Sequence, residues 1–176
     1  APYGVIGSII PSTNPVSTVA CNSISMIAAG NAIVFNAHPG ARASSNFAIQ
    51  LVNQAIVEAG GPQNLACAIA NPTIETAQTI MKHEGINLLT VTGGIGVVQE
   101  AMQSGKRAIC AGPGNPPVVV DESADLEQAG RDIVRGASFD NNIICTDEKE
   151  IFAVSSIADE LKKAMCRYGA LELDQE

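Results

Sequence analysis

Short apolar runs alternate with helix-like segments along most of this chain, and that alternation limits the folds it can adopt. The runs are rich in Ile, Val, Leu and Ala and stop close to Gly, Pro, Asn or Asp, as buried strands do. Alternating strands and helices predict right-handed βαβ crossovers. We therefore expect an α/β fold with a Rossmann-like, mainly parallel sheet flanked by helices. The expected strands cover 5–10, 32–35, 65–70, 87–91, 107–111 and 118–120.

The segments between these runs carry helix signals. Gly30-Asn31 and Gly60-Gly61-Pro62 each close a long helical pattern, because Gly and Pro are the residues that end helices. A further strand at 151–154 and the helix after it look like the beginning of another domain. The expected helices cover 16–29, 41–59, 74–81, 94–102, 126–136 and 157–165.

Charge and hydropathy exclude two classes of partner. The formal net charge is −8, whereas nucleic-acid binding needs a basic face. No stretch approaches the ~20 apolar residues of a membrane span, and no signal peptide opens the sequence. We therefore expect neither nucleic acid nor a membrane as a partner.

The five cysteines are odd in number and widely spread, and none forms a C-x-x-C pair. His38 and His83 stand alone. This pattern argues against a disulfide framework and against a structural zinc site, so we expect no metal. A reducing cytoplasm is the simplest setting for such thiols.

One cysteine ends a polar loop between two expected elements. The loop reads Ser-Phe-Asp-Asn-Asn-Ile-Ile-Cys over 138–145, and loops between regular elements often carry catalytic groups. Cys145 can act as a nucleophile if backbone N–H groups or a cation stabilise its thiolate. From the residues alone, a buried and inert thiol is the other interpretation.

A Gly-rich turn is the second candidate site. Gly93-Gly94-Ile95-Gly96 follows an expected strand and opens an expected helix, where free N–H groups can bind a phosphate. The turn lacks the G-x-G-x-x-G pattern of ordinary dinucleotide folds. A Gly-rich turn also serves packing alone, so the residues leave both interpretations open.

Phe139-Asp140-Asn141-Asn142 followed by Cys145 resembles the catalytic loop of the CoA-acylating aldehyde dehydrogenases. These enzymes oxidise acetaldehyde or propionaldehyde to an acyl-CoA, notably in ethanolamine and propanediol utilisation. The resemblance runs from Tyr3-Gly4-Val5-Ile6-Gly7 to the strand after Cys145. It implies part of the aldehyde dehydrogenase fold, with most of the cofactor-binding domain over 1–135. The start of the catalytic domain, with the nucleophile loop, would cover 136–176.

Both ends of the sequence look cut, so we expect a fragment of a longer protein. We also expect the segment after Cys145 to pack poorly without its missing partners. The resemblance implies that the full-length protein is a homo-oligomer located in the cytoplasm or inside a bacterial microcompartment.

The resemblance assigns the catalytic roles. Cys145 matches the family nucleophile, which adds to the aldehyde carbonyl and gives a thiohemiacetal. Asn14 matches the family Asn whose side-chain amide donates to the oxyanion, and the backbone N–H of Cys145 is the second donor. One such donor typically contributes roughly 3–4 kcal/mol in the transition state. Without the resemblance, Asn14 is a turn residue before Pro15.

The resemblance also implies NAD or NADP as cofactor, with coenzyme A as co-substrate. Thr92, Gly93 and Gly94 match the family's Thr-Gly-Ser segment, which lies against the cofactor, and small residues permit close backbone approach. Further cofactor-binding candidates lie in two other loops, namely Ser12, Thr13, His38 and Pro39. Many relatives hold the adenosine ribose with a Lys-Pro-Ser-Glu segment where this chain has 36–39. Neither that Lys nor that Glu is present here, so the choice between NAD and NADP stays open.

Position 110 separates two branches of the resembled family. Hydrolytic aldehyde dehydrogenases carry a Glu there that activates water, and this chain has Cys110. The thiol of CoA, with a pKa near ~8.5, is a better nucleophile than water. We therefore predict that a short-chain aldehyde is oxidised to an acyl-CoA.

Three alternatives remain open. The chain could belong to the aldehyde dehydrogenase half of a bifunctional aldehyde–alcohol dehydrogenase, whose motifs are similar. It could belong to a hydrolytic aldehyde dehydrogenase, which Cys110 argues against. It could also be a catalytically incomplete fragment that serves only nucleotide binding or assembly.

Overall fold

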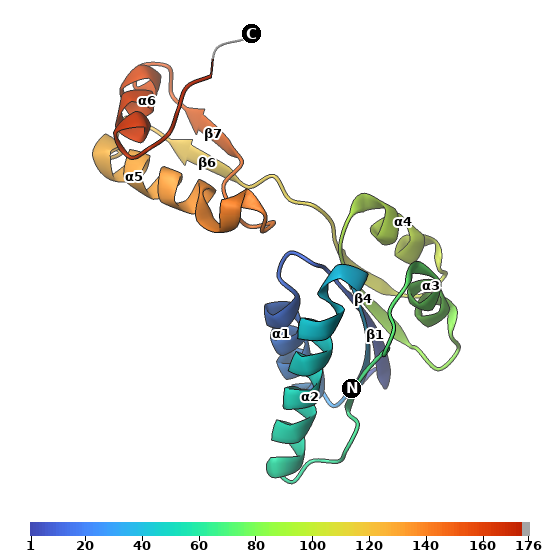
Figure 1. Ribbon diagram of the computed structural model, residues 1–176. Coiled ribbons are helices and arrows are strands. Elements are labelled where there is room, and N and C mark those ends of the chain that lie inside the picture. The colour runs from blue at the N-terminus through green and yellow to red at the C-terminus, as the bar shows by residue number, and fades with distance from the viewer. Residues whose placement is uncertain (174–176) are drawn as a thin grey trace. The chain divides into compact units, whose positions relative to one another are not determined.

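A parallel five-stranded sheet forms the first part of the protein. The computed structural model describes residues 1–173, and the sheet runs in the order β3-β2-β1-β4-β5 (Figure 1). Every neighbouring pair in the sheet is parallel, which confirms the α/β fold expected from the sequence. The strands are β1 (Val5–Ile10), β2 (Ala32–Ala37), β3 (Ala66–Ala68), β4 (Leu88–Thr92) and β5 (Ala108–Ala111).

Helices cover both faces of this sheet. α1 and α2 pack on one face, and α3 and α4 pack on the other (Figure 1). Strand β1 shows why, since Ile6 and Ile10 point to the first face while Ile9 points to the second. The helices are α1 (Pro15–Ala28), α2 (Arg42–Glu58), α3 (Ile74–Lys82) and α4 (Ile95–Gln103).

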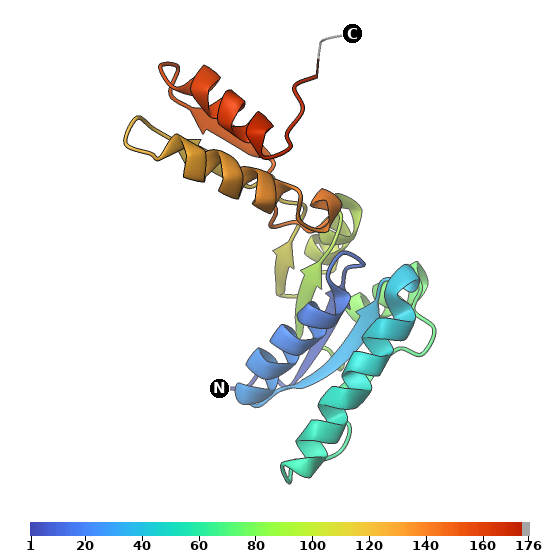
Figure 2. The ribbon, with the colours of Figure 1, turned by 60° about the vertical axis from the view of Figure 1, so that its left-hand side comes forward.

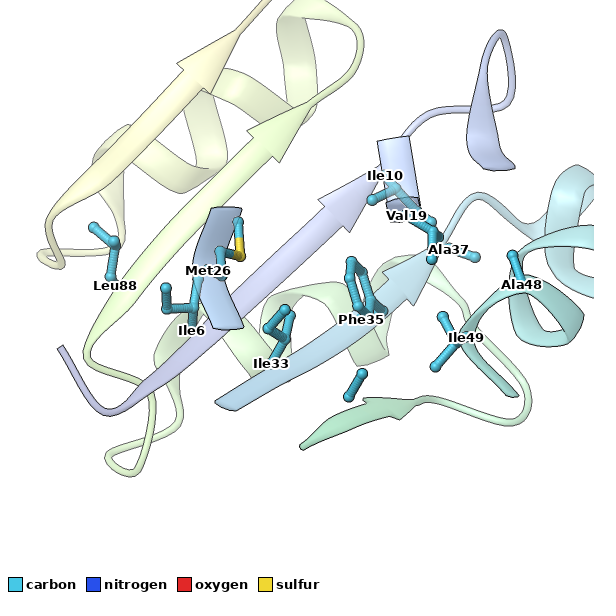
Figure 3. Packing of buried hydrophobic residues seen from close by; sticks show 11 residues of the cluster. Ile6, Ile10, Val19, Met26, Ile33, Phe35, Ala37, Ala48, Ile49 and Leu88 are labelled. Atoms are coloured by element: carbon cyan, nitrogen blue, oxygen red, sulfur yellow. The ribbon is translucent and has the colours of Figure 1, made fainter. Parts of the chain in front are cut away.

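The apolar core under α1 and α2 is built from strand residues and the inner faces of the helices. Phe35 on β2 is fully buried and lies among residues of β1, α1 and α2 (Figure 3). Val19 and Met26 come from α1, and Ala48 and Ile49 come from α2. Burial of these side chains from water is what holds the helices on the sheet.

A second, smaller unit begins at Gly114. In it, β6 (Pro117–Val120) and β7 (Glu150–Ala153) form a parallel pair. α5 (Leu126–Ala137) and α6 (Ala158–Arg167) lie side by side over one face of this pair (Figure 2). The short 3-10 helix η2 (Phe139–Asn142) follows α5 and leads into the Cys145 loop.

The packing division of the chain differs from the predicted domain boundary at 135/136. Ala1–Pro113 form one compact unit, and β6 and α5 belong to the other, because they pack against β7 and α6. Strand β6 therefore pairs with β7 instead of extending the first sheet. The functional assignment of 1–135 and 136–176 stays a prediction.

The segment after Cys145 contributes to a small core together with β6 and α5, and the expectation that it packs poorly without missing partners stays a prediction. Leu161 of α6 is buried with Val120 and Ile133 in a core of its own. The backbones of α5 and α6 approach so closely at Gly130 that a Cβ there would lie 2.7 Å from the Cβ of Ala164. The opposite face of the strand pair stays open to solvent, with Val119 and Phe152 77% and 57% exposed.

No helix among residues 1–173 combines the length and the hydropathy needed to cross a membrane. The same part of the chain contains no group of three or more His, Cys, Asp and Glu side chains placed to hold a metal ion. All five cysteines are free.

Gly130→Ala should destabilise the second unit although Ala is the better helix former. The gain in helix propensity is about 1 kcal/mol. The new methyl group would meet backbone atoms of Ala164 and Met165 at 2.9 Å, and overpacking of this kind costs typically ~1–3 kcal/mol. Hydrogen exchange followed by mass spectrometry should show lost protection in α5 and α6.

Gly96→Ala is the matched control, because a Cβ at Gly96 in α4 meets nothing within 4 Å. This variant should leave the exchange of α5 and α6 unchanged. Unchanged or increased protection of these helices in Gly130→Ala would contradict the close-packing argument.

Candidate functional site

Three adjacent strands end at one edge of the large sheet, and the loops that follow them carry the cofactor candidates. Ser12 and Thr13 follow β1, His38 and Pro39 follow β2, and Thr92 ends β4. Since β2, β1 and β4 are neighbours and parallel, their carboxyl ends lie together. The fold therefore brings these predicted residues to one edge.

The sheet order places a topological switch point between β1 and β4. The chain runs from β1 outward to β2 and β3, and it then returns to the other side of β1 as β4. In open α/β sheets, ligands bind in the crevice outside the strand ends at such a point. The Asn14 loop and the turn at Gly93 and Gly94 flank this position.

Asn14 occupies the N-cap position of α1, with Pro15 as the first helical residue. Its backbone carbonyl accepts from the N–H of Thr18 at 3.1 Å and from the Thr18 hydroxyl at 2.8 Å. The Thr13 hydroxyl donates to Oδ1 of Asn14 at 3.2 Å, which orients the carboxamide and leaves its NH₂ group as a donor. The positive end of the α1 dipole adds a field that favours negative charge at this place.

The first turn of α4 has the open backbone that a phosphate site needs. Gly94 is the N-cap and makes no side-chain cap hydrogen bond, and a Cβ at Gly94 or Gly96 would meet nothing within 4 Å. The N–H of Gly93 donates to the carbonyl of Ala111 on β5 at 3.1 Å, which fixes the start of the turn. The N–H groups at this helix terminus therefore fit a dinucleotide phosphate.

His38 has a structural contact in this protein. It is exposed, and its Nδ1 accepts from the N–H of Gly40 at 3.1 Å, capping the short 3-10 helix η1 (Pro39–Ala41). Asn36, the first residue of the 36–39 segment, is buried, and its Oδ1 accepts from the Thr76 hydroxyl at 2.6 Å. No carboxylate follows β2 among residues 36–39, where dinucleotide folds typically carry the ribose-binding acid.

Cys145 lies in a tight turn of the second unit and is partly buried. The N–H of Asp147 donates to the carbonyl of Ile144 at 3.3 Å, so Cys145 is the second residue of this turn. Gly114 approaches the turn closely, since a Cβ there would lie 2.9 Å from the Cys145 carbonyl oxygen. Cys145 and Asn14 belong to different units, and their joint action in an oxyanion hole stays a prediction.

Cys110 on β5 is a partly buried thiol packed against the cluster under α3 and α4. Burial raises the pKa of the Cys110 thiol above its usual value. The side chain is therefore neutral at physiological pH, and it cannot serve as the carboxylate base that activates water.

Similarity to known proteins gives the family. The family model described as "Aldehyde dehydrogenase family" matches residues 1–170. The chain belongs to the aldehyde dehydrogenase family.

Relatives within this family come from its CoA-acylating branch. The chain is 58% identical over 177 residues to an acetylating acetaldehyde dehydrogenase, EutE, of Escherichia coli K12, covering 100% of this chain and 38% of that protein. It is 40% identical over 168 residues to the bifunctional aldehyde-alcohol dehydrogenase AdhE of the same organism, covering 96% of this chain and 19% of AdhE. These values confirm the resemblance found in the sequence, and the chain spans less than half the length of these relatives.

Solved structures agree closely with the fold. A propionaldehyde dehydrogenase from the fucose utilisation microcompartment of Clostridium phytofermentans matches with a TM-score of 0.93 and 50% identity, over 99% of this chain and 40% of that one. A Rhodopseudomonas palustris propionaldehyde dehydrogenase with bound CoA and an acylated cysteine matches with a TM-score of 0.93 and 48% identity, over 99% of this chain and 40% of that one. An engineered glycolyl-CoA reductase with bound NADP+ matches with a TM-score of 0.92 and 48% identity, over the same shares.

Gly93→Val should weaken NAD(P)+ binding, because a Cβ at Gly93 would lie 2.7 Å from Cγ1 of Val97 and displace the first turn of α4. Loss of one hydrogen bond to a charged phosphate costs ~1.5–3 kcal/mol, so the dissociation constant should rise at least about tenfold. Calorimetric titration of the full-length enzyme with NAD+ and with NADP+ measures this. Gln103→Ala, at the exposed far end of α4, is the control, and an unchanged constant in Gly93→Val would remove the turn from the site.

The thiol of Cys110 should titrate at higher pH in the folded protein than in the unfolded chain, because burial disfavours its thiolate. The stability that comes from keeping this thiol neutral is fully present below the unfolded pKa. It is lost as the pH rises from the unfolded pKa through the higher folded pKa. The rate of iodoacetamide labelling of Cys110 against pH, with and without denaturant, measures both states. A midpoint at equal or lower pH in the folded protein would contradict the assignment.

Proposed function

We propose that this chain is part of a CoA-acylating aldehyde dehydrogenase, which oxidises a short-chain aldehyde with NAD(P)+ and CoA to an acyl-CoA. The observation that carries the proposal is the 58% identity, over the whole chain, to an acetylating acetaldehyde dehydrogenase. The reaction converts aldehyde, NAD(P)+ and CoA to acyl-CoA, NAD(P)H and a proton.

In this proposal Cys145 carries the acyl group. Its thiolate adds to the aldehyde carbonyl, and the amide of Asn14 and the backbone N–H of Cys145 stabilise the charge on the oxygen. Loss of hydride from the thiohemiacetal leaves a thioester on Cys145. The thiol of CoA then attacks the thioester, which releases acyl-CoA and restores the Cys145 thiol.

NAD(P)+ supplies the hydride acceptor when it is bound. We propose that Thr92, Gly93 and Gly94 hold its phosphates at the uncapped start of α4, with Ser12 and Thr13 across the switch point. His38 and Pro39 would lie on the adenosine side, after β2. No carboxylate stands among 36–39 to repel a 2′-phosphate, so this segment does not disfavour NADP+.

The acyl group is released to CoA rather than to water in this proposal. Activation of water needs a base, and position 110 supplies a neutral, partly buried thiol instead of a carboxylate. CoA brings its own nucleophile, because a thiol is partly ionised near neutral pH. The same reasoning disfavours a hydrolytic aldehyde dehydrogenase.

The setting of the full-length enzyme is also part of the proposal. We propose a homo-oligomer located in the cytoplasm or inside a bacterial microcompartment, which is the source of one structural relative. The uncovered apolar face at Val119 and Phe152 supports a longer protein that packs there. An aldehyde–alcohol dehydrogenase is less favoured, because the identity to AdhE is 40% against 58% to EutE.

Cys145→Ala in the full-length enzyme should abolish aldehyde oxidation, with a loss of at least about 10⁴-fold in kcat, because no thiohemiacetal can form. Cys145→Ser should be nearly as damaging, since a hydroxyl is a weak nucleophile at neutral pH. NAD(P)H formation with and without CoA, together with mass spectrometry of the Cys145 peptide, measures both steps. Without CoA, only a small burst of NAD(P)H should appear.

The controls are Cys21→Ala, Cys67→Ala and Cys166→Ala, which change exposed thiols and should leave kcat intact. Rapid CoA-independent formation of free acid, or an acyl adduct on another cysteine, would contradict the proposal. Activity of the 176-residue chain compared with the full-length enzyme decides whether this part alone is only a nucleotide-binding or assembly fragment.

A further inference from the structure

The loop before Cys145 has an unusual backbone. Asp140, Asn141 and Asn142 are consecutive and have φ values of 47°, 53° and 60°. Asn and Asp tolerate this left-handed region better than most residues, but L-residues adopt it as single positions rather than in runs. The structure must therefore hold this segment in place by contacts outside it.

Two side chains supply those contacts. The NH₂ group of Asn142 donates to the carbonyl of Ala137 at 2.7 Å and to the carbonyl of Glu148 at 3.1 Å. The ammonium of Lys149 donates to the carbonyl of Asn142 at 3.2 Å and to the carbonyl of Ile144 at 3.3 Å. Together they tie the end of α5 to the segment that enters β7.

Lys149 is placed for this role by its own backbone. Its N–H donates to the carbonyl of Pro116 at 2.9 Å, at the start of the β6–β7 pair. The side chain is partly buried, and none of the ion pairs within residues 1–173 involves it. Its two side-chain hydrogen bonds both go to backbone carbonyls of the loop.

The carbonyl of Ile144 belongs to the same peptide unit as the N–H of Cys145. That carbonyl accepts from the Lys149 ammonium and also from the N–H of Asp147, each at 3.3 Å. A charge-assisted hydrogen bond to the oxygen of an amide draws electron density away from its nitrogen, which makes the N–H a stronger donor. It also fixes the plane of the peptide.

We propose that Lys149 is a positioning residue for the reaction, which orients and polarises the Ile144–Cys145 peptide so that its N–H stabilises the oxyanion. The inference rests on the proposed function, because it takes Cys145 as the nucleophile. A purely structural Lys149 would tie down the loop without affecting the charge that develops on the substrate oxygen.

The test uses Lys149→Met, Lys149→Arg and Lys163→Met in the full-length enzyme. Met keeps the apolar stem and removes the charge, Arg keeps the charge, and Lys163 is an exposed lysine of α6. Three quantities are measured: kcat and KM for the aldehyde, the rate of Cys145 alkylation by iodoacetamide, and the thermal midpoint. Alkylation forms no oxyanion, so it reports the thiol and its accessibility alone.

Lys149→Met should lower kcat by about 10- to 100-fold, less than the 10²–10³ of losing a donor outright. KM and the alkylation rate should each change by less than about threefold. The polarised N–H stabilises the oxyanion, which is present neither in the bound aldehyde nor in the alkylation reaction. Lys149→Arg should restore at least about a third of the wild-type kcat, and Lys163→Met should match the wild type. If Lys149→Met does not fold, Lys149→Gln takes its place with the same expectations.

Asn142→Gly separates polarisation from mechanical support. Gly adopts the left-handed region without strain, so this variant removes two hydrogen bonds of the loop and leaves the ammonium in place. It should lower kcat by less than about fivefold, as expected for neutral hydrogen bonds near the surface. A loss equal to that of Lys149→Met would make the contact purely mechanical and overturn the proposal.

The remaining outcomes are also decisive. A wild-type kcat in Lys149→Met would overturn the inference, and so would a kcat loss matched by a fall in thermal midpoint and a rise in alkylation. Cys145→Ala, measured in parallel, separates a failure of the proposed function from a failure of the role given to Lys149. If it retains activity, the proposed function fails; if it is inactive while Lys149→Met is normal, only the role of Lys149 fails.

Discussion

The pairing of β1 with β2 on one side and β4 on the other is the constraint on which the larger unit depends. β1 contributes Ile6 and Ile10 to one core and Ile9 to the other, so helices must cover both faces. Gly7 permits this on the α3 side, because a Cβ there would lie 2.5 Å from Cγ2 of Ile80. The same pairing brings the ends of β2, β1 and β4 to one edge. The fold and the location of the candidate cofactor site therefore have one physical cause.

The two candidate catalytic groups are presented by different kinds of structure. Asn14 stands at the start of a regular helix, where a proline and its own backbone carbonyl fix it. Cys145 stands in an irregular turn that is held by side-chain hydrogen bonds from Asn142 and Lys149. A nucleophile on a strained loop depends on its supporting contacts, since a small displacement of the backbone misplaces both the thiol and the donor N–H.

The family relationship and the chemistry of position 110 support different parts of the proposed function. Membership of the aldehyde dehydrogenase family follows from the match over residues 1–170. The family by itself does not choose between water and a thiol as the final acceptor, because a fold hosts more than one chemistry. The resemblance implies that hydrolytic aldehyde dehydrogenases carry Glu at the position of Cys110. The neutral thiol of Cys110 is therefore the local feature that, in the proposed function, favours CoA over water as the acyl acceptor.

The sequence by itself determined the element order, the parallel sheet and the loops that carry the candidate site, because the pattern of apolar residues records which parts of an element are buried. The resemblance of the segments around Cys145 and Asn14 to the motifs of aldehyde dehydrogenases also indicated the family. Only the tertiary structure decided that β6 pairs with β7, that α5 meets α6 at Gly130, and that Lys149 donates to the carbonyl of Ile144. The apolar pattern of a helix or strand predicts that one of its faces is covered, but it does not identify the element that covers it. Hydrogen bonds between a side chain and a distant carbonyl leave no regular pattern in the sequence, so they become visible only when the chain is folded.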